Sequence, residues 1–346
     1  MDVPQLNERE RRVLEAVIRS YVETAEPAGS RMISRRFGLG VSPATIRNTM
    51  SDLEDKGFLF HPHTSAGRVP TDMAYRVYVD SLMRIHTPDL EAHDRMRGEL
   101  STGGAGIEAI LRRAAQMLGV LTQELGVAIG PSFEDLVLER LELIRVSSER
   151  LLLVLRLRGG AAHTLFVEAP GEIAGTALAT VAMVLNERLG GLSLREIRRT
   201  LGSRLRDAET ASDAQELLNI FIQEGEQIFD VAPPLVRDVV LGTTSVLAEQ
   251  PEFASSDGMR KLLALTDRPQ ALGDLLRRRD SAPGITITIG REHNDPTLAQ
   301  LTLVTAEYHL GGLAGVIGVI GPTRMPYEKV ISLVTHTSRL MTDLLA

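Results

Sequence analysis

The sequence contains no cysteine and no tryptophan, and aromatic residues make up only 4% of its 346 positions. The absence of cysteine excludes disulfides, thiolate chemistry and cysteine-based zinc sites, and it fits a cytoplasmic protein. With so few aromatic side chains, the hydrophobic core must be built mainly from Leu, Val, Ile and Ala. At this length we expect two or three domains.

Long hydrophobic runs are also lacking. Residues 1–5 have neither the basic nor the apolar region of a signal peptide, and the apolar run at 310–321 is too short to span a bilayer. We therefore expect no membrane insertion. The 8 histidines are scattered, and none has a serine or carboxylate at the spacing of a nucleophile and its base. The sequence thus predicts no enzyme and no cofactor.

The net charge of −7 is unevenly distributed. Residues 1–84 carry 12 basic and 11 acidic side chains, whereas residues 85–346 carry 26 and 34. Within residues 29–70 the balance is 6 basic to 3 acidic. An acidic chain with a locally basic N-terminal segment is compatible with DNA binding, with only modest long-range steering.

A helix with one apolar face is predicted near the N-terminus. Asn7 and Glu10 form a capping pair, and apolar residues then recur at helical spacing from Val13 to Val22. After a second short helix, residues 38–40 make a glycine turn, because glycine adopts positive φ at little cost. This succession leads into a third helix over residues 42–54.

The third helix has the pattern of a DNA-recognition helix. Ser42 is a suitable N-cap, and Pro43 occupies the first helical position, where its missing N–H costs nothing. Ile46, Met50 and Leu53 share one side and should face the core. On the opposite side, Arg47 suits guanine edges and Asn48 can pair with adenine in the major groove. Small residues beside them let the helix lie deep in that groove. The amides at the helix start suit DNA phosphates. The candidate DNA contacts here are Ser42, Pro43, Ala44, Thr45, Arg47, Asn48 and Ser51.

A β-hairpin wing follows this helix. Gly57 ends the helix, and residues 58–60 begin the hairpin. Small hydrogen-bond donors and one cation lie at its tip, as a contact with the DNA backbone or minor groove requires. These candidates are His63, Thr64, Ser65 and Arg68. The two nearby histidines do not predict a metal site, because no cysteine or acidic partner accompanies them. The order of elements predicts a winged helix-turn-helix.

The rest of the chain alternates between helical and strand patterns. A helix over 75–85 and a linker at 101–106 lead into it. A glycine-rich run at 311–321 lacks the Gly-Lys-Ser/Thr of a phosphate loop, so we expect close strand packing there. Arg277 to Arg279 are interpreted as a solvated helix end, with contact to DNA or to a partner protein as the alternative. Strands are expected at 126–130, 136–146, 151–157, 163–168, 285–289, 298–305 and 315–320, and further helices at 107–125, 177–188, 194–205, 213–229 and 327–345.

Several long strings resemble the HrcA family of heat-inducible transcription repressors from bacteria. They comprise residues 27–30, 42–54 with Gly57, 62–71, 75–80 and 315–327, so the resemblance covers both ends of the chain. It implies a homodimer that binds an inverted-repeat operator of chaperone operons and is released on heat shock. It also implies that the chaperonin assists the repressor into its active form.

The resemblance implies an α+β multidomain fold. Its parts are a winged helix-turn-helix over 1–84, a connecting helix and linker over 85–106, and a GAF-like α/β domain over 107–135 and 240–346. An inserted α+β dimerisation domain over 136–239 interrupts the GAF-like domain, although the strands at 136–169 are also compatible with the GAF-like sheet. GAF-like folds often hold small effectors.

Two other functions remain open from the sequence. A small-molecule-gated winged-helix/GAF regulator would change its operator affinity with a metabolite, but no charged or aromatic pocket set is evident. A chaperonin-interacting or scaffolding protein would use its helical N-terminal module to bind protein, and would show no saturable DNA binding at physiological salt.

Overall fold

The structure is a computed structural model in which helices and strands are mixed, as expected. It describes residues 4–63, 67–83, 96–100, 107–131, 136–158, 162–168, 171, 173–208, 212–229, 239–267, 269–277, 284–310 and 313–345. The chain divides into two compact units. The first comprises residues 1–129, 239–307 and 316–341, and the second comprises residues 130–238, 308–315 and 342–346.

Three helices begin the first unit: α1 (Glu8–Thr24), α2 (Ser30–Phe37) and α3 (Pro43–Asp55). The predicted capping pair of α1 is confirmed, since the Glu10 amide donates to Asn7 (3.0 Å) and the Asn7 amide donates to Glu10 (2.9 Å). Gly38 has a φ of 54°, so the predicted glycine turn does use a left-handed residue after α2. The helices bury a common set of apolar side chains, which are Val13, Leu14, Val17, Ile18, Ile33, Ile46, Met50 and Leu53.

A short hairpin and a further helix complete this N-terminal module, by which we mean residues 4–63 and 67–83. Strands β1 (Leu59–Phe60) and β2 (Val69–Pro70) pair antiparallel. The helix expected over 75–85 begins earlier, as α4 (Asp72–Val77), and continues as the π-helical turn η1 (Tyr78–Leu82). Thr71 explains the earlier start, because its hydroxyl accepts from the Ala74 amide and caps α4. The end of the expected helix and the linker at 101–106 lie outside the described residues.

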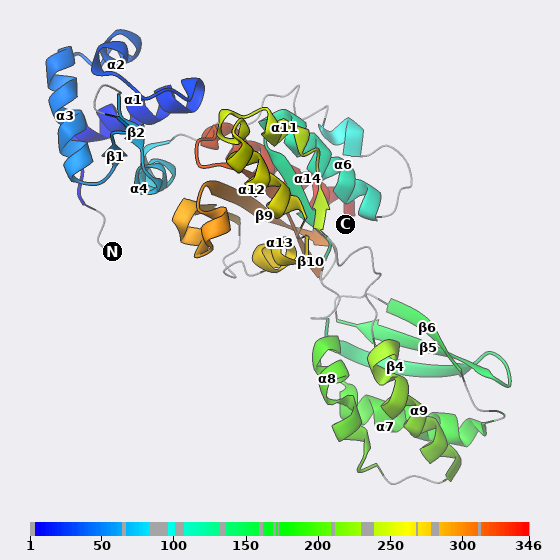
Figure 1. The fold of residues 1–346 in the computed structure, drawn as a ribbon. Helices are drawn as coiled ribbons and strands as arrows, with labels where there is room; N and C mark the ends of the chain where they lie inside the picture. The colour runs from blue at the N-terminus through cyan, green and yellow to red at the C-terminus, as the bar shows by residue number, and fades with distance from the viewer. Residues whose placement is uncertain are drawn as a thin grey trace. The chain divides into compact units, whose positions relative to one another are not determined.

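The larger part of the first unit, here called the body, is built on a five-stranded sheet in the order β7-β3-β10-β9-β8 (Figure 1). The paired strands β7/β3, β3/β10 and β9/β8 are antiparallel. The bounds of these strands are β3 (Leu125–Ile129), β7 (Val239–Leu241), β8 (Ile285–Ile289), β9 (Leu301–Leu310) and β10 (Leu313–Pro322).

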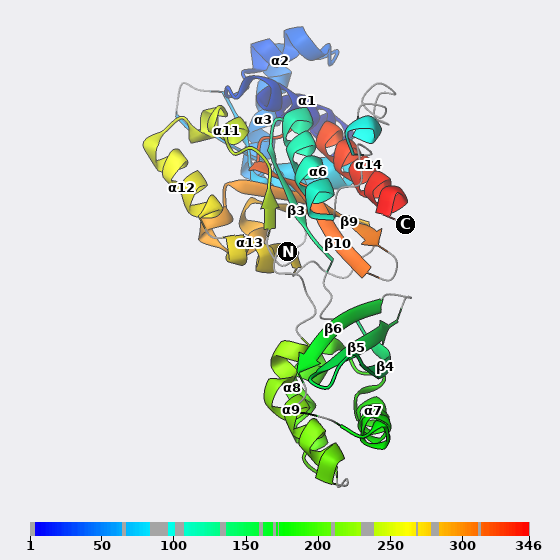
Figure 2. The ribbon, with the colours of Figure 1, turned by 90° about the vertical axis from the view of Figure 1, so that its right-hand side faces the viewer.

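Helices cover both faces of this sheet. Figure 2 shows α6 (Ile107–Thr122) and α14 (Tyr327–Leu345) side by side on one face. Leu125, Val127 and Ile129 of β3 point to the opposite face and share a core with Leu272 and Leu276. Because side chains alternate along a strand, Gly126 points toward α6. The shorter helices on the second face are α11 (Ser245–Ala248), η2 (Pro251–Phe253), α12 (Ser256–Thr266) and α13 (Pro269–Arg277).

The sequence patterns missed part of this body. The sequence predicts no strand between residues 168 and 285, yet residues 239–241 form β7, which pairs with β3. The strand expected from Leu298 begins at Leu301, because Pro296 opens a 3-10 turn, η4 (Pro296–Leu298), that Asp295 caps by accepting from the Thr297 amide (2.8 Å). Another 3-10 turn, η3 (Gly290–His293), follows β8. Arg278 and Arg279 of the arginine run lie outside the described residues.

The glycine-rich run packs as predicted. It contributes most of β10, and a Cβ atom on Gly318 would lie 2.2 Å from the Val304 carbonyl oxygen of β9. Any larger residue at this position would push the two strands apart. Gly311 and Gly312 lie outside the described residues.

The second unit has its own sheet and its own core (Figure 1). Strands β4 (Leu138–Arg145), β5 (Arg150–Leu157) and β6 (Ala162–Glu168) form a three-stranded antiparallel sheet. Helices α7 (Gly175–Leu189), α8 (Leu194–Leu205) and α9 (Ser212–Ile228) pack on one face of it. Asn186 fixes α7 to β4, since its side chain accepts from the Leu141 amide and donates to the Leu141 carbonyl, both at 2.7 Å.

Among the described residues, no helix combines the length and the apolarity needed to cross a bilayer.

Gly126→Ala should destabilise the body. A Cβ atom at this position would lie 1.8 Å from the Ala115 carbonyl oxygen of α6, which is backbone and cannot rotate away. We expect the free energy of unfolding, measured by denaturant titration with far-UV circular dichroism, to fall by about 1–3 kcal/mol or more. The control is Gly98→Ala, where no atom lies within 4 Å of the added Cβ. Equal stability of the two variants would contradict the packing described here.

Candidate nucleic-acid interface

The start of α3 is fixed by its cap. Ser42 accepts from the Thr45 amide at 3.1 Å, and Pro43 follows at the first helical position, as predicted. The hydroxyls of Ser42 and Thr45 also lie 3.0 Å apart and share a hydrogen bond. The sequence predicts that the amides at the start of the helix bind phosphates. The Thr45 amide already donates to the cap, so it is not free for a phosphate. Ser42, Pro43 and Ala44 are exposed, whereas Thr45 is half-buried.

The outer face of α3 presents the candidate base-contacting side chains to solvent. Arg47, Asn48 and Ser51 are all exposed, and together with Ala44 they lie opposite the buried face of the helix. A guanidinium and a carboxamide one turn from a helix N-terminus match the donor and acceptor edges of guanine and adenine in a major groove. The structure thus brings these four candidates onto one solvent-facing surface.

The hairpin places its candidates differently. His63 is exposed, while Thr64 and Ser65 lie outside the described residues. The Arg68 side chain is only 14% exposed, and its Nη2 lies 2.7 Å from Glu54 Oε2 at the end of α3. The same carboxylate lies 3.0 Å from Nδ1 of His61 on the hairpin. Phe60, which the sequence analysis did not select, is 44% exposed on β1.

The Glu54 carboxylate therefore ties the hairpin to α3. Arg68 also holds the hairpin through its backbone, which exchanges two hydrogen bonds with Ala28 (2.8 and 3.0 Å). In this geometry Arg68 positions the hairpin beside α3, whereas the sequence predicts its charge at the tip. Nothing in the spacing of Glu54, His61 and Arg68 predicts this cluster, because it depends on the return of β2 past the end of α3.

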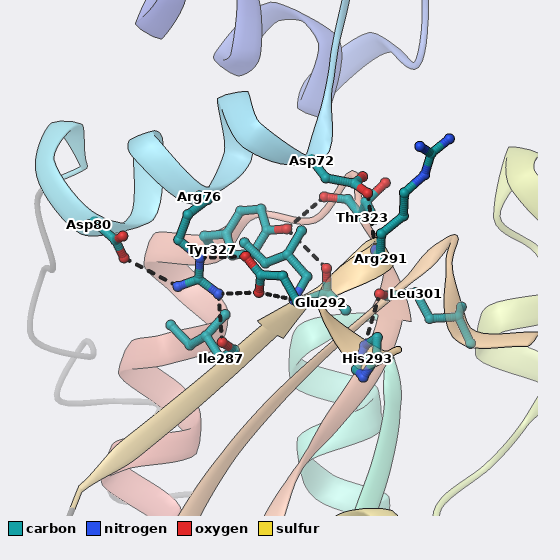
Figure 3. A network of polar contacts seen from close by, with 12 residues as sticks. Asp72, Arg76, Asp80, Ile287, Arg291, Glu292, His293, Leu301, Thr323 and Tyr327 are labelled. Carbon is teal, nitrogen blue, oxygen red and sulfur yellow. Dashed lines mark hydrogen bonds and ion pairs between the residues drawn. The ribbon is translucent and has the colours of Figure 1, made fainter. Parts of the chain in front are cut away.

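The far side of the N-terminal module is joined to the body by a polar network (Figure 3). Arg76 of α4 donates to Glu292 Oε1 (2.8 Å), to the Ile287 carbonyl (2.7 Å) and to Asp80 (3.2 Å). Burial alone would raise the pKa of Glu292, but the hydrogen bonds from Arg76 and from the Ile289 amide outweigh it and lower that pKa. Glu292 is therefore held as a carboxylate. Neither Arg76 nor Glu292 is predicted as a functional residue by the sequence.

No group of three or more His, Asp or Glu side chains suited to a metal ion occurs within the described part of the chain. His61 is engaged by Glu54 instead. The N-terminal module can bind through a helix face, because the candidate side chains Arg47, Asn48 and Ser51 are exposed together on α3.

A capped helix with an exposed polar face, preceded by two helices and followed by a hairpin, defines a candidate DNA-binding module of the helix-turn-helix class. Residues 108–331 match the family described as "HrcA protein C terminal domain". The chain belongs to the HrcA family.

Full-length relatives have the same family name. The chain is 39% identical over 341 residues to a heat-inducible transcription repressor HrcA of Chlorobium phaeobacteroides, covering 96% of both chains. It is 37% identical to the protein of that name from Geobacter sulfurreducens, covering 98% of both. A solved structure described only as a hypothetical protein has a TM-score of 0.55 and 22% identity, with 98% of this chain and 100% of that chain covered. That last likeness concerns the fold alone.

Glu54→Gln should loosen the hairpin without unfolding the module. The variant removes the charge that holds Arg68 and His61, a change of roughly 1 kcal/mol for partly exposed ion pairs, or about fivefold in local opening. Hydrogen–deuterium exchange of peptides covering residues 54–71 should accelerate by about that factor. Asp52→Asn removes the same kind of charge from an exposed position on α3 and should leave the exchange unchanged. Equal exchange in the two variants would refute the positioning role of Glu54.

Proposed function

We propose that this protein is a transcription repressor of heat-shock genes that binds operator DNA through the outer face of α3. The observation that carries the proposal is the solvent-facing set Arg47, Asn48 and Ser51 on a capped helix whose other face is buried. Its relatives are named heat-inducible transcription repressors, a role that requires DNA and is not enzymatic. Transcription in bacteria takes place in the cytoplasm, where we place the protein. No cofactor enters the proposal.

The domain arrangement proposed with this function follows the family resemblance. Residues 1–84 form a winged helix-turn-helix, and 85–106 connect it to a GAF-like domain over 107–135 and 240–346. Residues 136–239 form an inserted dimerisation domain. The separate cores of the two units support this division, as does the pairing of β4, β5 and β6 with one another in their own sheet.

A homodimer is proposed because an inverted-repeat operator offers two equivalent half-sites to two modules. The open face of the three-stranded sheet supports an interface in the second unit. Ile144, Leu152 and Phe166 lie opposite one another in register across the three strands. Ile144 is 47% exposed and Phe166 is 56% exposed, which is unusual for large apolar side chains in a row. The Arg150 guanidinium lies 4.7 Å from the Phe166 ring and borders the row with charge.

The chaperonin is proposed as a second protein partner. The resemblance implies that this chaperone assists the repressor into its active form. Occupation of the chaperonin by misfolded proteins would then leave the repressor inactive and the chaperone operons open.

The central test is a fluorescence-anisotropy titration of the full chain with an inverted-repeat operator and with a half-site-scrambled duplex of equal length. At ~150 mM salt, with chaperonin present, we expect a preference of ~10³-fold or more for the operator. Arg47→Ala should relax the preference among base-substituted half-sites by roughly 1–3 kcal/mol if Arg47 pairs with a guanine. Arg112→Ala removes an arginine from an exposed ion pair on α6 and should retain the full preference.

Equal weak binding to both duplexes would reject the repressor and favour the protein-binding alternative. Undiminished base discrimination in Arg47→Ala, with the operator preference intact, would remove only Arg47 from the base-contacting set. A higher operator affinity on adding chaperonin would support the proposal that the chaperonin assists the repressor into its active form. An unchanged affinity would count against the chaperonin as a partner and would leave the repressor standing.

Phe166→Glu should weaken the dimer. Burying a carboxylate in an apolar interface costs at least as much as losing a central aromatic contact, so we expect the dissociation constant to rise by about 30-fold or more. Sedimentation equilibrium measures this directly. Leu263→Glu, which alters a side chain that is 54% exposed on α12, should leave the dimer unchanged. If Phe166→Glu dimerises as the unaltered chain does, the apolar row is not the interface.

A further inference from the structure

Two arginines cross the junction between the N-terminal module and the body in opposite directions. Arg76 of the module reaches the body at Glu292 and at the Ile287 carbonyl (Figure 3). Arg324 of the body, in the segment between β10 and α14, reaches the module, where its Nη1 donates to the Val22 carbonyl of α1 at 2.7 Å. We call this pair of crossing contacts the arginine latch.

Arg324 is held so that Nη1 is its only side-chain nitrogen without a bond to Glu252 or Gln250. Its Nε donates to Glu252 at 2.7 Å, and its Nη2 donates to Gln250 at 2.8 Å. The side chain is 11% exposed, so water competes little for these bonds. A guanidinium fixed by two partners on its own side points its remaining donor in one direction. The hydrogen bond therefore forms only when the module brings the Val22 carbonyl to the position of Nη1.

Helix α1 lacks any basic residue of its own in its last turn. The carbonyls of a last turn have no partners within the helix and carry the negative end of the helix dipole. Arg324 supplies a positive charge to this end from the body. The end of α1 is therefore complemented by Arg324 only while the module is docked.

Further contacts near Arg76 also join the module to the body. Asp72 accepts from the Arg291 amide at 3.1 Å, and the Tyr78 hydroxyl donates to Glu328 at 3.0 Å. The ring centroids of Tyr75 in α4 and Tyr327 in α14 lie 5.7 Å apart. The module is thus held at the end of α1, along α4 and at η1. Three separated points of attachment fix an orientation, whereas one would only tether it.

The docked orientation leaves the DNA-facing side free. Arg47, Asn48 and Ser51 are exposed in the same structure in which the latch is closed. The latch therefore does not block the surface of α3. It determines the orientation of that surface relative to the body.

We propose that Arg76 and Arg324 are positioning residues that set the operator half-site spacing which the repressor accepts. The inference rests on the proposed function, since spacing has meaning only for a dimer on an inverted repeat. Each base pair inserted between half-sites rotates one relative to the other by about 35° and moves it about 3.4 Å. A module held at three points cannot follow that displacement, whereas a module without these contacts is no longer held in one orientation against the body.

The test uses the full chain and duplexes in which the centre of the operator is lengthened or shortened by one or two base pairs. The unaltered protein should lose at least about tenfold in affinity for each changed spacing relative to the natural one. For the same changes of spacing, the affinities of Arg76→Ala and Arg324→Ala should fall several-fold less than the affinity of the unaltered protein. All proteins should bind a duplex with a single half-site equally well, because the latch does not touch DNA. Far-UV circular dichroism verifies that each variant is folded.

Glu292→Gln provides a variant outside the DNA-binding module, since it weakens the Arg76 contact from the body side. It should flatten the spacing dependence in the same direction as Arg76→Ala. Arg112→Ala, which alters an exposed i,i+4 pair on α6, is the matched control and should keep the steep dependence. Merely destabilised variants would lose affinity for all duplexes alike, including the single half-site.

The outcomes separate the two proposals. A steep dependence in the unaltered protein that flattens in the latch variants supports the inference. Operator preference with a flat spacing dependence in the unaltered protein overturns the inference and leaves the repressor standing. An equally steep dependence in the latch variants overturns it as well. Equal binding to operator and scrambled duplex overturns the proposed function, and the inference with it.

Discussion

Burial of one face of α3 is the constraint on which the candidate interface depends. Ile46 and Leu53 have no exposed surface, and Met50 is 3% exposed. Each such side chain contributes roughly 1.5–3 kcal/mol when it is buried, whereas an N-cap such as Ser42 contributes about 1 kcal/mol. Packing against α1 and α2 therefore holds the helix, and the cap fixes where it begins. Thr49 is buried as well, and with these four positions buried the helical period directs Arg47 and Asn48 to solvent.

Charge has a structural role on both sides of this module. Glu54 joins the hairpin to α3 through Arg68 and His61, and the latch joins the module to the body. Two of the arginines that look like free cations in the sequence, Arg68 and Arg76, are thus engaged within the protein. The basic character of residues 29–70 overstates the charge available to DNA, because a carboxylate lies against Arg68.

The sheets of the body and of the second unit differ in how helices cover them. In the body, α6 approaches β3 so closely that only glycine fits at position 126, and helices cover both faces of the sheet. In the second unit, helices pack on one face of the three-stranded sheet, and the other face carries the exposed row through Ile144 and Phe166. A sheet face with exposed large apolar side chains is what an oligomer interface requires.

The sequence by itself determined the elements that local physics controls. The Asn7 and Ser42 caps, the buried face of α3 and the amphipathic α14 follow from capping chemistry and a period of 3.6 residues, which need no knowledge of distant contacts. The family also follows from local strings at both ends of the chain. The sequence did not reveal β7, because three residues beside a helical pattern become a strand only when β3 offers its edge.

Only the tertiary structure decided which side chains meet. Arg324 lies 302 residues from Val22, and Arg76 lies 216 residues from Glu292, so no periodicity links either pair. The same is true of Arg68, whose partner Glu54 is reached only after the hairpin folds back. Contacts between separate elements depend on the path of the whole backbone. They decide whether a charged side chain faces a ligand or holds the protein in shape.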